Sequence, residues 1–196
     1  MSKVALIMGS LRRPGNGIGI ANWLTPILRN NLEQTDVVFL DSTKPPLPLG
    51  PIVDGTHVPA DVRDPTQHPN PTVREFASFI TSCNGFVFLS PEYNGSYSGE
   101  MKNTLDHLYW EWQKKPALVV TYGGGGGTRA ATQLRGLLEG PFKMKLTEKG
   151  VAIKWPKGAG TVPPDGEAPE WLQGFEPEVL AAIEEFKRLL AQQNSA

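Results

Sequence analysis

Apolar residues along the chain form short continuous runs that alternate with longer stretches of helical spacing. A continuous run is typical of a strand covered on both faces, and intervals of three and four are typical of an amphipathic helix. We expect strands at residues 3–8, 36–40, 85–90 and 117–122, with a weaker fifth at 151–153. We expect helices at about 18–31, from Asn70-Pro71 through Ile80, at 99–114, at about 128–138 and at about 177–192.

Two prolines affect these helices differently. Pro26 lies inside the first helix, and because proline lacks a backbone N–H it should kink or shorten that helix. Pro71 follows Asn70, which suits the first turn of a helix capped by asparagine.

The order of these elements predicts a doubly wound α/β fold. Strands that are apolar on both faces and alternate with helices form a parallel sheet covered on both sides. We expect a five-stranded sheet of order 2-1-3-4-5 in a three-layer α/β/α arrangement. Residues 42–69 and 154–174 do not fit the repeat and are expected to form long ordered loops.

Length and composition narrow the class of protein. A chain of 196 residues is expected to form a single domain, residues 1–196. With 19 Lys plus Arg against 20 Asp plus Glu, no excess positive charge is available for a nucleic-acid backbone. One cysteine, Cys83, cannot form an internal disulfide, which favours the cytoplasm. No apolar stretch approaches the roughly 20 residues needed to span a membrane.

Three loops of unusual composition follow the first, third and fourth strands, at residues 9–19, 91–99 and 123–127. The carboxyl ends of parallel strands share one edge, and ligands bind there beside the point where strand order reverses. We therefore expect the three loops to converge on one ligand.

The first loop combines the side chains of Ser10, Arg12 and Asn16 with several glycines just before a helix. The unpaired N–H groups and partial positive charge of a helix N-terminus suit a phosphate, although a glycine-rich turn without a ligand is the plain alternative. The third glycine position of a dinucleotide fingerprint holds Ile20, and no Gly-Lys-Ser/Thr sequence occurs. Dinucleotide and nucleoside-triphosphate sites are therefore disfavoured.

The second and third loops suit the edges of a flat heterocycle. Backbone N–H groups and Tyr93 in the second loop would donate to ring atoms that gain electron density on reduction, although its Asn94-Gly95 step also suits a simple polar turn. The five glycines of the third loop would let a planar ligand lie against the main chain, or would form a flexible linker. Because no nucleophile is paired with a base, we expect a flavin to carry the chemistry and no side chain to be catalytic.

The chain resembles the NADPH-dependent FMN reductase family, which includes flavodoxin-like quinone, azo-dye and chromate reductases. The resemblance covers residues 3–153 and rests on three sets of residues. These are Gly9-Ser10-Leu11-Arg12; Pro91-Glu92-Tyr93-Asn94-Gly95-Ser96 with Lys102-Asn103 and Asp106; and the glycine-rich stretch leading to Arg129 and Gln133-Leu134-Arg135. It implies a flavodoxin-like fold, bound FMN, NADPH or NADH as co-substrate, and a homodimer or a homotetramer built from two dimers.

The resemblance also implies which residues hold FMN. By matching position, the residues implied to bind the phosphate are Ser10, Arg12, Asn16, Gly17 and Ile18. The residues implied to contact the isoalloxazine ring are Pro91, Glu92, Tyr93, Asn94 and Gly95. Those implied to contact its other edge are Tyr122, Gly123, Gly124 and Gly125. Many relatives carry Ser and Asn where this chain has Gly15 and Gly17, which would place more of the phosphate charge on Arg12 and Asn16.

Several other polar and aromatic residues receive no catalytic role. His57, His68 and His107 lack metal-ligand spacing and are expected at the surface or in a substrate pocket. Cys83 is expected to be a small buried hydrophobe, and Glu92 to shape its loop.

The predicted helix at 99–114 raises the question of a partner. Lys102 and Asp106 form an i, i+4 pair that is either an exposed helix pair or part of a subunit contact. Trp110 and Trp112 would lie on different sides of the helix, one in the core and the other against a partner subunit or a substrate pocket.

The working hypothesis is an FMN-dependent oxidoreductase that passes two electrons from NAD(P)H to a quinone or similar small acceptor by a ping-pong exchange. The alternatives are a flavin-dependent redox sensor that docks on a partner and a one-electron carrier. Balanced charge disfavours the carrier, because docking of such carriers is usually steered by charge.

Overall fold

The computed structural model describes residues 2–47, 50 and 56–194. Its centre is a parallel sheet built from β1 (Ser2–Met8), β2 (Thr35–Leu40), β3 (Gly85–Tyr93) and β5 (Pro116–Gly123), with β6 (Lys145–Leu146) and β7 (Val151–Lys154) beside β5. The order is β2-β1-β3-β5-β6, so strand order reverses between β1 and β3 as the sequence predicts. The remaining strand, β4 (Ser96–Tyr97), pairs antiparallel with the end of β3.

The fifth position of the sheet is divided between two short strands. Pro116 of β5 pairs with Lys145 of β6, whereas Val120 of β5 pairs with Val151 of β7. Between them Gly150 lies so close to β5 that an added Cβ would be 2.6 Å from the carbonyl oxygen of Val119. The predicted strand at 151–153 is thus confirmed, and the break before it reflects this close backbone approach.

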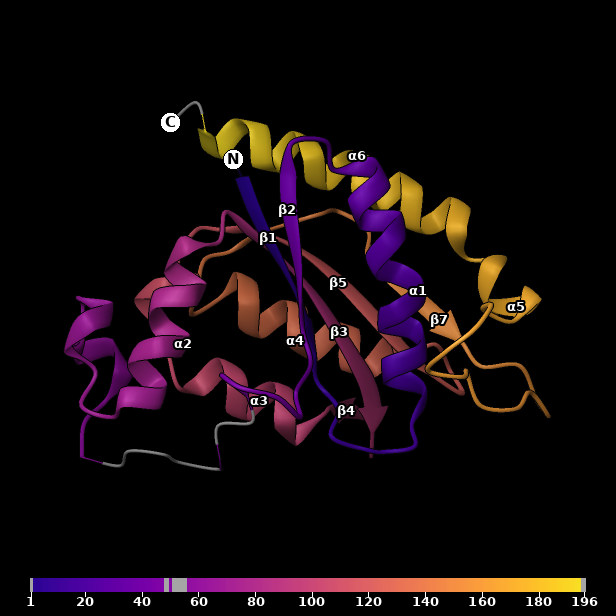
Figure 1. Ribbon diagram of the computed structural model, residues 1–196, viewed down its shortest axis with the longest axis horizontal. Helices are drawn as coiled ribbons and strands as arrows, with labels where there is room; N and C mark the ends of the chain where they lie inside the picture. The colour runs from indigo at the N-terminus through magenta and orange to yellow at the C-terminus, as the bar shows by residue number, and fades with distance from the viewer. Residues whose placement is uncertain (1, 48–49, 51–55, 195–196) are drawn as a thin grey trace.

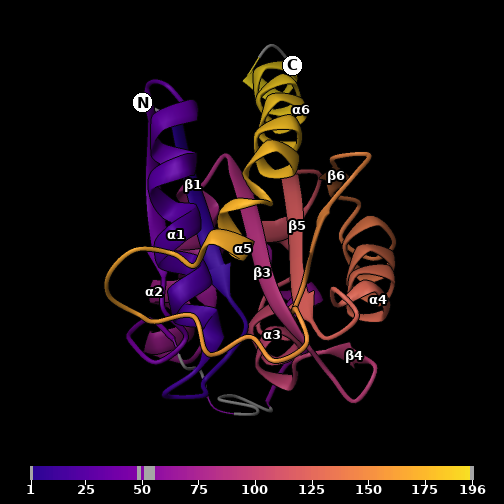
Figure 2. The ribbon, with the colours of Figure 1, turned by 90° about the vertical axis from the view of Figure 1, so that its right-hand side faces the viewer.

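Helices cover both faces of the sheet (Figures 1 and 2). On one face, α1 (Asn16–Asn31) and α6 (Glu176–Asn194) bury side chains such as Leu24 and Phe186. On the other, α2 (Pro71–Ser82), α3 (Gly99–Asp106) and α4 (Thr128–Glu139) bury side chains such as Phe76 and Leu134. The three-layer α/β/α arrangement expected from the sequence is confirmed. The short α5 (Glu170–Gln173) lies just before α6.

Of the two effects expected of Pro26, a kink or a shorter helix, the shortening does not occur. The helix continues through it to Asn31. Both Pro26 and Asn22 four residues earlier are exposed, so the carbonyl that loses its N–H partner faces solvent.

The helix expected at residues 99–114 is also wrong in its second half. Here α3 ends at Asp106, and a separate 3₁₀ turn, η3 (Trp110–Trp112), follows. The Trp112 indole N–H donates to the Leu105 carbonyl at 3.1 Å and thereby satisfies the end of α3. Trp112 is fully buried among Phe76, Phe86 and other aromatic rings, so core packing turns the chain inward.

Trp110 packs on the proline-rich segment, residues 42–69, which contains the 3₁₀ turns η1 (Pro59–Asp61) and η2 (Pro65–Gln67). Its indole N–H donates to the carbonyl of Ala60 at 2.8 Å, and the Arg63 guanidinium lies 3.9 Å from the centroid of its ring. Trp112 is thus the tryptophan expected in the core, and Trp110 packs on this chain's own loop.

His68, expected at the surface or in a substrate pocket, is fully buried. Its Nε2 lies 3.0 Å from the carboxylate of Glu111, itself buried, and its backbone carbonyl accepts a hydrogen bond from Arg74. The end of the proline-rich segment is therefore fixed to η3 by a buried polar pair. Among the described residues no group of three His, Cys, Asp or Glu residues is arranged to hold a metal ion.

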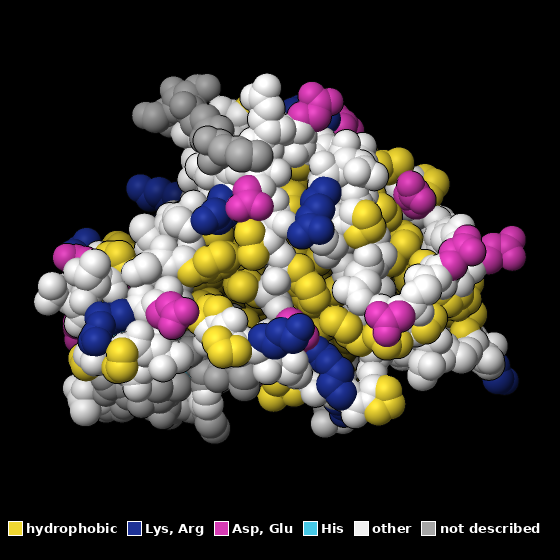
Figure 3. All heavy atoms as spheres, in the orientation of Figure 1, with side chains coloured by type: hydrophobic (Ala, Val, Ile, Leu, Met, Phe, Trp, Pro, Cys, Tyr) yellow, Lys and Arg dark blue, Asp and Glu magenta, His cyan; other side chains and the backbone are white. Residues whose placement is uncertain are grey.

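Cys83 is buried, as expected, and burial raises the pKa of its thiol to about 11. On the face drawn in Figure 3, Lys and Arg side chains are interspersed with Asp and Glu, so this face has no continuous basic stripe for a nucleic-acid backbone. No helix in the described part of the chain is both long and apolar enough to cross a membrane.

Candidate flavin site

The loops after β1, β3 and β5 meet at the carboxyl edge of the sheet. The Ser10 hydroxyl of the first loop lies 2.9 Å from the Tyr93 hydroxyl of the second. The Glu92 carboxylate of the second accepts hydrogen bonds from the main-chain N–H and from Nε of Arg129, at the start of α4 after the third loop. The convergence expected from sequence is confirmed by these contacts.

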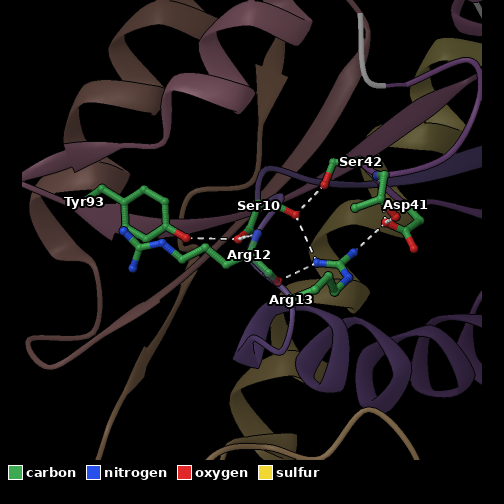
Figure 4. A network of polar contacts seen from close by, with 7 residues as sticks. Ser10, Arg12, Arg13, Asp41, Ser42 and Tyr93 are labelled. Carbon is green, nitrogen blue, oxygen red and sulfur yellow. Dashed lines mark hydrogen bonds and ion pairs between the residues drawn. The ribbon is translucent and has the colours of Figure 1, made fainter.

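Ser10 is the centre of a polar network in the first loop (Figure 4). Its carbonyl oxygen accepts hydrogen bonds from the hydroxyl of Ser42 and, at 3.3 Å, from the Arg13 guanidinium. Arg13 also forms an ion pair with Asp41 at 2.6 Å. These contacts fix the main chain of the turn, so the Ser10 hydroxyl is held where Tyr93 meets it.

The pKa of Asp41 is set by opposing effects. Burial favours the protonated form, but hydrogen bonds from Thr43 and the positive charges of Arg13 and Lys44 outweigh it and lower the pKa. The carboxylate therefore stays charged and keeps the Arg13 guanidinium on the turn. The Arg12 side chain extends instead toward Tyr93, and its guanidinium lies 3.9 Å from the centroid of the Tyr93 ring (Figure 4).

The first turn of α1 has the properties of an anion site. Its N-cap is Gly15, which supplies no side-chain hydrogen bond, and its first turn contains no acidic residue. The first N–H groups of the helix thus lack a side-chain acceptor, while Ser10 and Arg12 lie in the loop directly before them. The side-chain oxygen of Asn16 accepts a hydrogen bond from the N–H of Val162 at 3.0 Å.

Gly17 allows Tyr122 to approach this turn. An added Cβ at Gly17 would lie 2.7 Å from the Tyr122 hydroxyl, so no other residue fits there without displacing the ring. Tyr122 is buried, and burial together with the neighbouring Tyr93 raises the pKa of its hydroxyl, against the smaller effects of Ser10, Arg12 and Arg13. The hydroxyl therefore stays protonated at neutral pH and can donate a hydrogen bond.

The second loop is a tight hairpin. Asn94 and Gly95 both have positive φ, 51° and 80°, and join β3 to β4 with Tyr93 opposite Ser96. A two-residue turn of this kind matches the twist of the paired strands. The Gln133 side chain on α4 donates to the Gly95 carbonyl and accepts from the Ser96 hydroxyl, so the hairpin is held on a helix.

The glycines of the third loop serve two different purposes. Gly126 and Gly127 have φ of 77° and 71°, and the Gly127 backbone packs against Thr121, so the turn itself requires them. Gly124 and Gly125 are exposed, and added side chains there would meet nothing within 4 Å. The open main chain at these two positions is available to a ligand.

These residues fit FMN. A helix start without a side-chain cap, next to an arginine and a serine, matches the charge and hydrogen-bonding needs of a phosphate monoester. The Tyr93 hairpin and the bare glycines lie at the next loops along the same edge, where a planar ring would extend from the phosphate.

The comparisons with known proteins agree. Residues 2–154 match the family described as NADPH-dependent FMN reductase. The chain belongs to this family. It is thus an FMN-dependent NAD(P)H oxidoreductase.

Named relatives support the assignment over most of the chain. The chain is 33% identical to the NAD(P)H-dependent FMN reductase ntnL of Nectria sp, over 98% of each chain. It is 35% identical to the NAD(P)H-dependent FMN reductase LOT6 of Saccharomyces cerevisiae, over 83% of this chain and 86% of that protein.

Solved structures share the fold. FerB, a flavoenzyme NAD(P)H:(acceptor) oxidoreductase from Paracoccus denitrificans, matches with a TM-score of 0.60 and 22% identity, over 94% of this chain and 98% of that one. Flavodoxin 1 from Bacillus cereus matches with a TM-score of 0.54 and 12% identity, over 95% and 98%.

Some residues that shape the site carry no clear signal in the sequence. Asp41 and Ser42 follow β2, outside the three glycine-rich loops, yet they hold the first loop through Arg13 and Ser10. Val162 lies 146 residues from Asn16, and its contribution is a backbone N–H that any residue except proline would supply.

Proposed function

We propose that FMN binds with its phosphate at the first turn of α1. The N–H groups of Gly17 and Ile18, the hydroxyl of Ser10, the guanidinium of Arg12 and the side chain of Asn16 would hold it. The observation that carries this placement is a helix start with no side-chain cap and no acid in its first turn, directly after a loop that carries Ser10 and Arg12.

The isoalloxazine ring would then extend along the edge between the second and third loops. Pro91, Glu92, Tyr93, Asn94 and Gly95 would line one side, and Tyr122, Gly123, Gly124 and Gly125 the other. The protonated Tyr122 hydroxyl would act as a donor, and the exposed main chain of Gly124 and Gly125 would allow close approach of the ring.

Bound FMN supplies the two-electron chemistry between NADPH or NADH and a small acceptor such as a quinone. The protein's part is to position the ring, donate hydrogen bonds to it and shield one of its faces, and no catalytic side chain is required. Because donor and acceptor would use the same exposed ring face, the donor leaves before the acceptor enters, which is a ping-pong exchange.

We further propose that all 196 residues form one flavin-binding unit that works as a homodimer or a homotetramer in the cytoplasm. A single buried cysteine suits a reducing compartment. The exposed pair formed by Lys102 and Asp106 on α3 is a candidate for the subunit contact.

A spectroscopic titration tests the function. The purified protein should take up one FMN per chain, lose its visible flavin absorption on addition of NADPH without air, and regain it on addition of a quinone. Steady turnover with NAD(P)H and a quinone distinguishes an enzyme from a redox sensor. A protein that stays colourless when FMN is added would contradict the proposal.

A further inference from the structure

Residues 155–164 follow β7 and lie outside the part of the chain that matches the family. In Figure 2 they run as an orange loop from the end of β7 across the lower end of α1. We infer that this segment sets the geometry of the flavin site, by fixing the Asn16 side chain so that its amide nitrogen faces the phosphate of FMN. The inference rests on the proposed function.

The first observation is the hydrogen bond between Val162 and Asn16. A backbone N–H can only donate, so the atom of the Asn16 amide that it meets must be the oxygen. The amide nitrogen makes no hydrogen bond within the described part of the chain, and Asn16 is the first residue of α1. Both N–H groups of that nitrogen are thus left to donate beside the turn that would hold the phosphate.

The second observation is that the segment packs tightly on α1. Val162 is buried, and a Cβ added at Gly19 would lie 2.5 Å from its Cγ1 and 2.6 Å from the carbonyl oxygen of Pro163. Farther along, the Asn22 side chain donates to the carbonyl of Pro164 at 2.6 Å. Asn16, Gly19 and Asn22 are three residues apart, so the segment lies along one side of the helix.

The third observation connects this segment to the other end of the site. The backbone N–H of Trp155 donates to the carbonyl of Gly123 at 2.8 Å, at the start of the third loop. The Trp155 ring packs edge-on against Trp171, with ring centroids 4.7 Å apart. One stretch of chain is therefore hydrogen-bonded to the loop proposed for the ring and to the residue proposed for the phosphate.

Asn16→Asp separates this role from general stability. The aspartate keeps an oxygen for the N–H of Val162 but replaces the donating nitrogen with a second oxygen and a negative charge. FMN affinity should fall at least about tenfold, because a charge-assisted hydrogen bond is lost and like charges meet. Riboflavin lacks the phosphate, so its affinity should stay within about twofold of the original protein.

Asn30→Asp is the matched control, with the same chemical change at an exposed position of the same helix, away from the segment. It should change FMN and riboflavin affinity by equal, small factors. Val162→Pro is a second variant, which removes the N–H that orients Asn16 and should weaken FMN binding more than riboflavin binding. Both affinities are measured by titrating each flavin and following its fluorescence.

Equal losses of FMN and riboflavin affinity in Asn16→Asp would overturn the inference, since they would make Asn16 a purely structural residue. Unchanged affinity for both flavins would overturn it as well. If the unaltered protein binds neither FMN nor riboflavin, the proposed function and this inference are both overturned. That result is distinct from the two results for Asn16→Asp.

Discussion

The two long segments outside the strand and helix alternation are fixed to the protein in different ways. Ser42, at the start of the proline-rich segment (residues 42–69), donates to the Ser10 carbonyl, but the end of that segment, residues 56–69, is fixed by the buried pair of His68 and Glu111. Among the described residues neither of these two side chains hydrogen-bonds to a residue proposed to hold flavin. Residues 155–164 are instead fixed by hydrogen bonds to Asn16 and Gly123, both proposed flavin residues.

This difference predicts which segment contributes mainly to the stability of the protein and which contributes mainly to flavin binding. A segment held by a buried polar pair contributes to the free energy of unfolding, because breaking such a pair leaves a polar group buried without a partner. A segment held on the cofactor loops contributes to their geometry. Changes at the end of the first segment, residues 56–69, should therefore lower stability with little effect on flavin affinity, and changes that displace the second segment should mainly lower flavin affinity.

The largest effect is expected at the buried pair. Glu111→Ala leaves the Nε2 of His68 buried without its hydrogen-bond partner and should lower the free energy of unfolding by about 2–3 kcal/mol. Urea unfolding of the FMN-free protein measures this, with the exposed Lys187–Glu184 pair as a control, where Glu184→Ala should cost less than about 0.5 kcal/mol. A tenfold loss of FMN affinity in Glu111→Ala would contradict this comparison, because the buried pair would then also affect flavin binding.

Gly19→Ala should affect the second segment. The added methyl group collides with Val162 and with the Pro163 carbonyl, so the segment must move, at a cost of about 1–2 kcal/mol in stability. FMN affinity should fall about tenfold, since Asn16 loses its fixed orientation. The control is Gly136→Ala, an exposed mid-helix glycine with nothing within 4 Å of an added Cβ, which should stabilise the protein by about 0.5–1 kcal/mol. Unchanged FMN affinity in Gly19→Ala would show that the segment does not act on the site.

A smaller effect is expected from Arg63→Ala in the proline-rich segment. It removes the guanidinium from the face of Trp110 and should lower the free energy of unfolding by about 0.5–1 kcal/mol. Thermal unfolding of FMN-free protein is the measurement. FMN affinity should be unchanged, and a change would mean that this segment also acts on the flavin site.

At neutral pH the smallest effect is expected from Cys83 and Lys115, at the end of α2 and just before β5, because their contributions to stability change only above neutral pH. Burial raises the pKa of the thiol from 9.0 to about 11, so the unfolded chain loses this proton first and stability falls as pH rises through that range. Burial lowers the pKa of Lys115 from 10.5 to about 8, so the folded protein loses that proton first and stability rises from about pH 8 to 10.5.

The two titrations oppose each other between pH 9 and 10.5. Cys83→Ala removes the falling contribution, so its free energy of unfolding should gain on that of the original protein as pH rises from 9 to 11. Denaturant unfolding of FMN-free protein at several pH values measures the difference. Parallel pH profiles for the two proteins would contradict this expectation.

The sequence predicts those parts of the fold that depend on local pattern. Apolar runs such as the one in β3 identify the sheet, and Asn94-Gly95 indicates a turn, because strand burial and turn conformation follow from nearby residues. That this turn is a hairpin closed by β4 was not predicted. The placement of the glycine-rich loops after strands likewise predicts that these loops meet at one edge of the sheet.

Features that depend on distant partners were wrong or absent in the prediction. Residues 110–112 continue a helical pattern, yet Glu111 turns inward to a histidine 43 residues away and Trp112 enters the core. The hydrogen bond between Asn16 and Val162 leaves no trace in residue type, since one partner is a backbone group. These contacts are fixed by tertiary packing, which the spacing of apolar residues does not reveal.

A crystal structure of the protein with FMN tests the central claim most directly. The account predicts the phosphate at the first turn of α1, within hydrogen-bond distance of Ser10, Arg12 and Asn16, and the ring between the Tyr93 hairpin and Gly124-Gly125. A phosphate bound away from the start of α1, or a ring that contacts neither of the two loops, would contradict it.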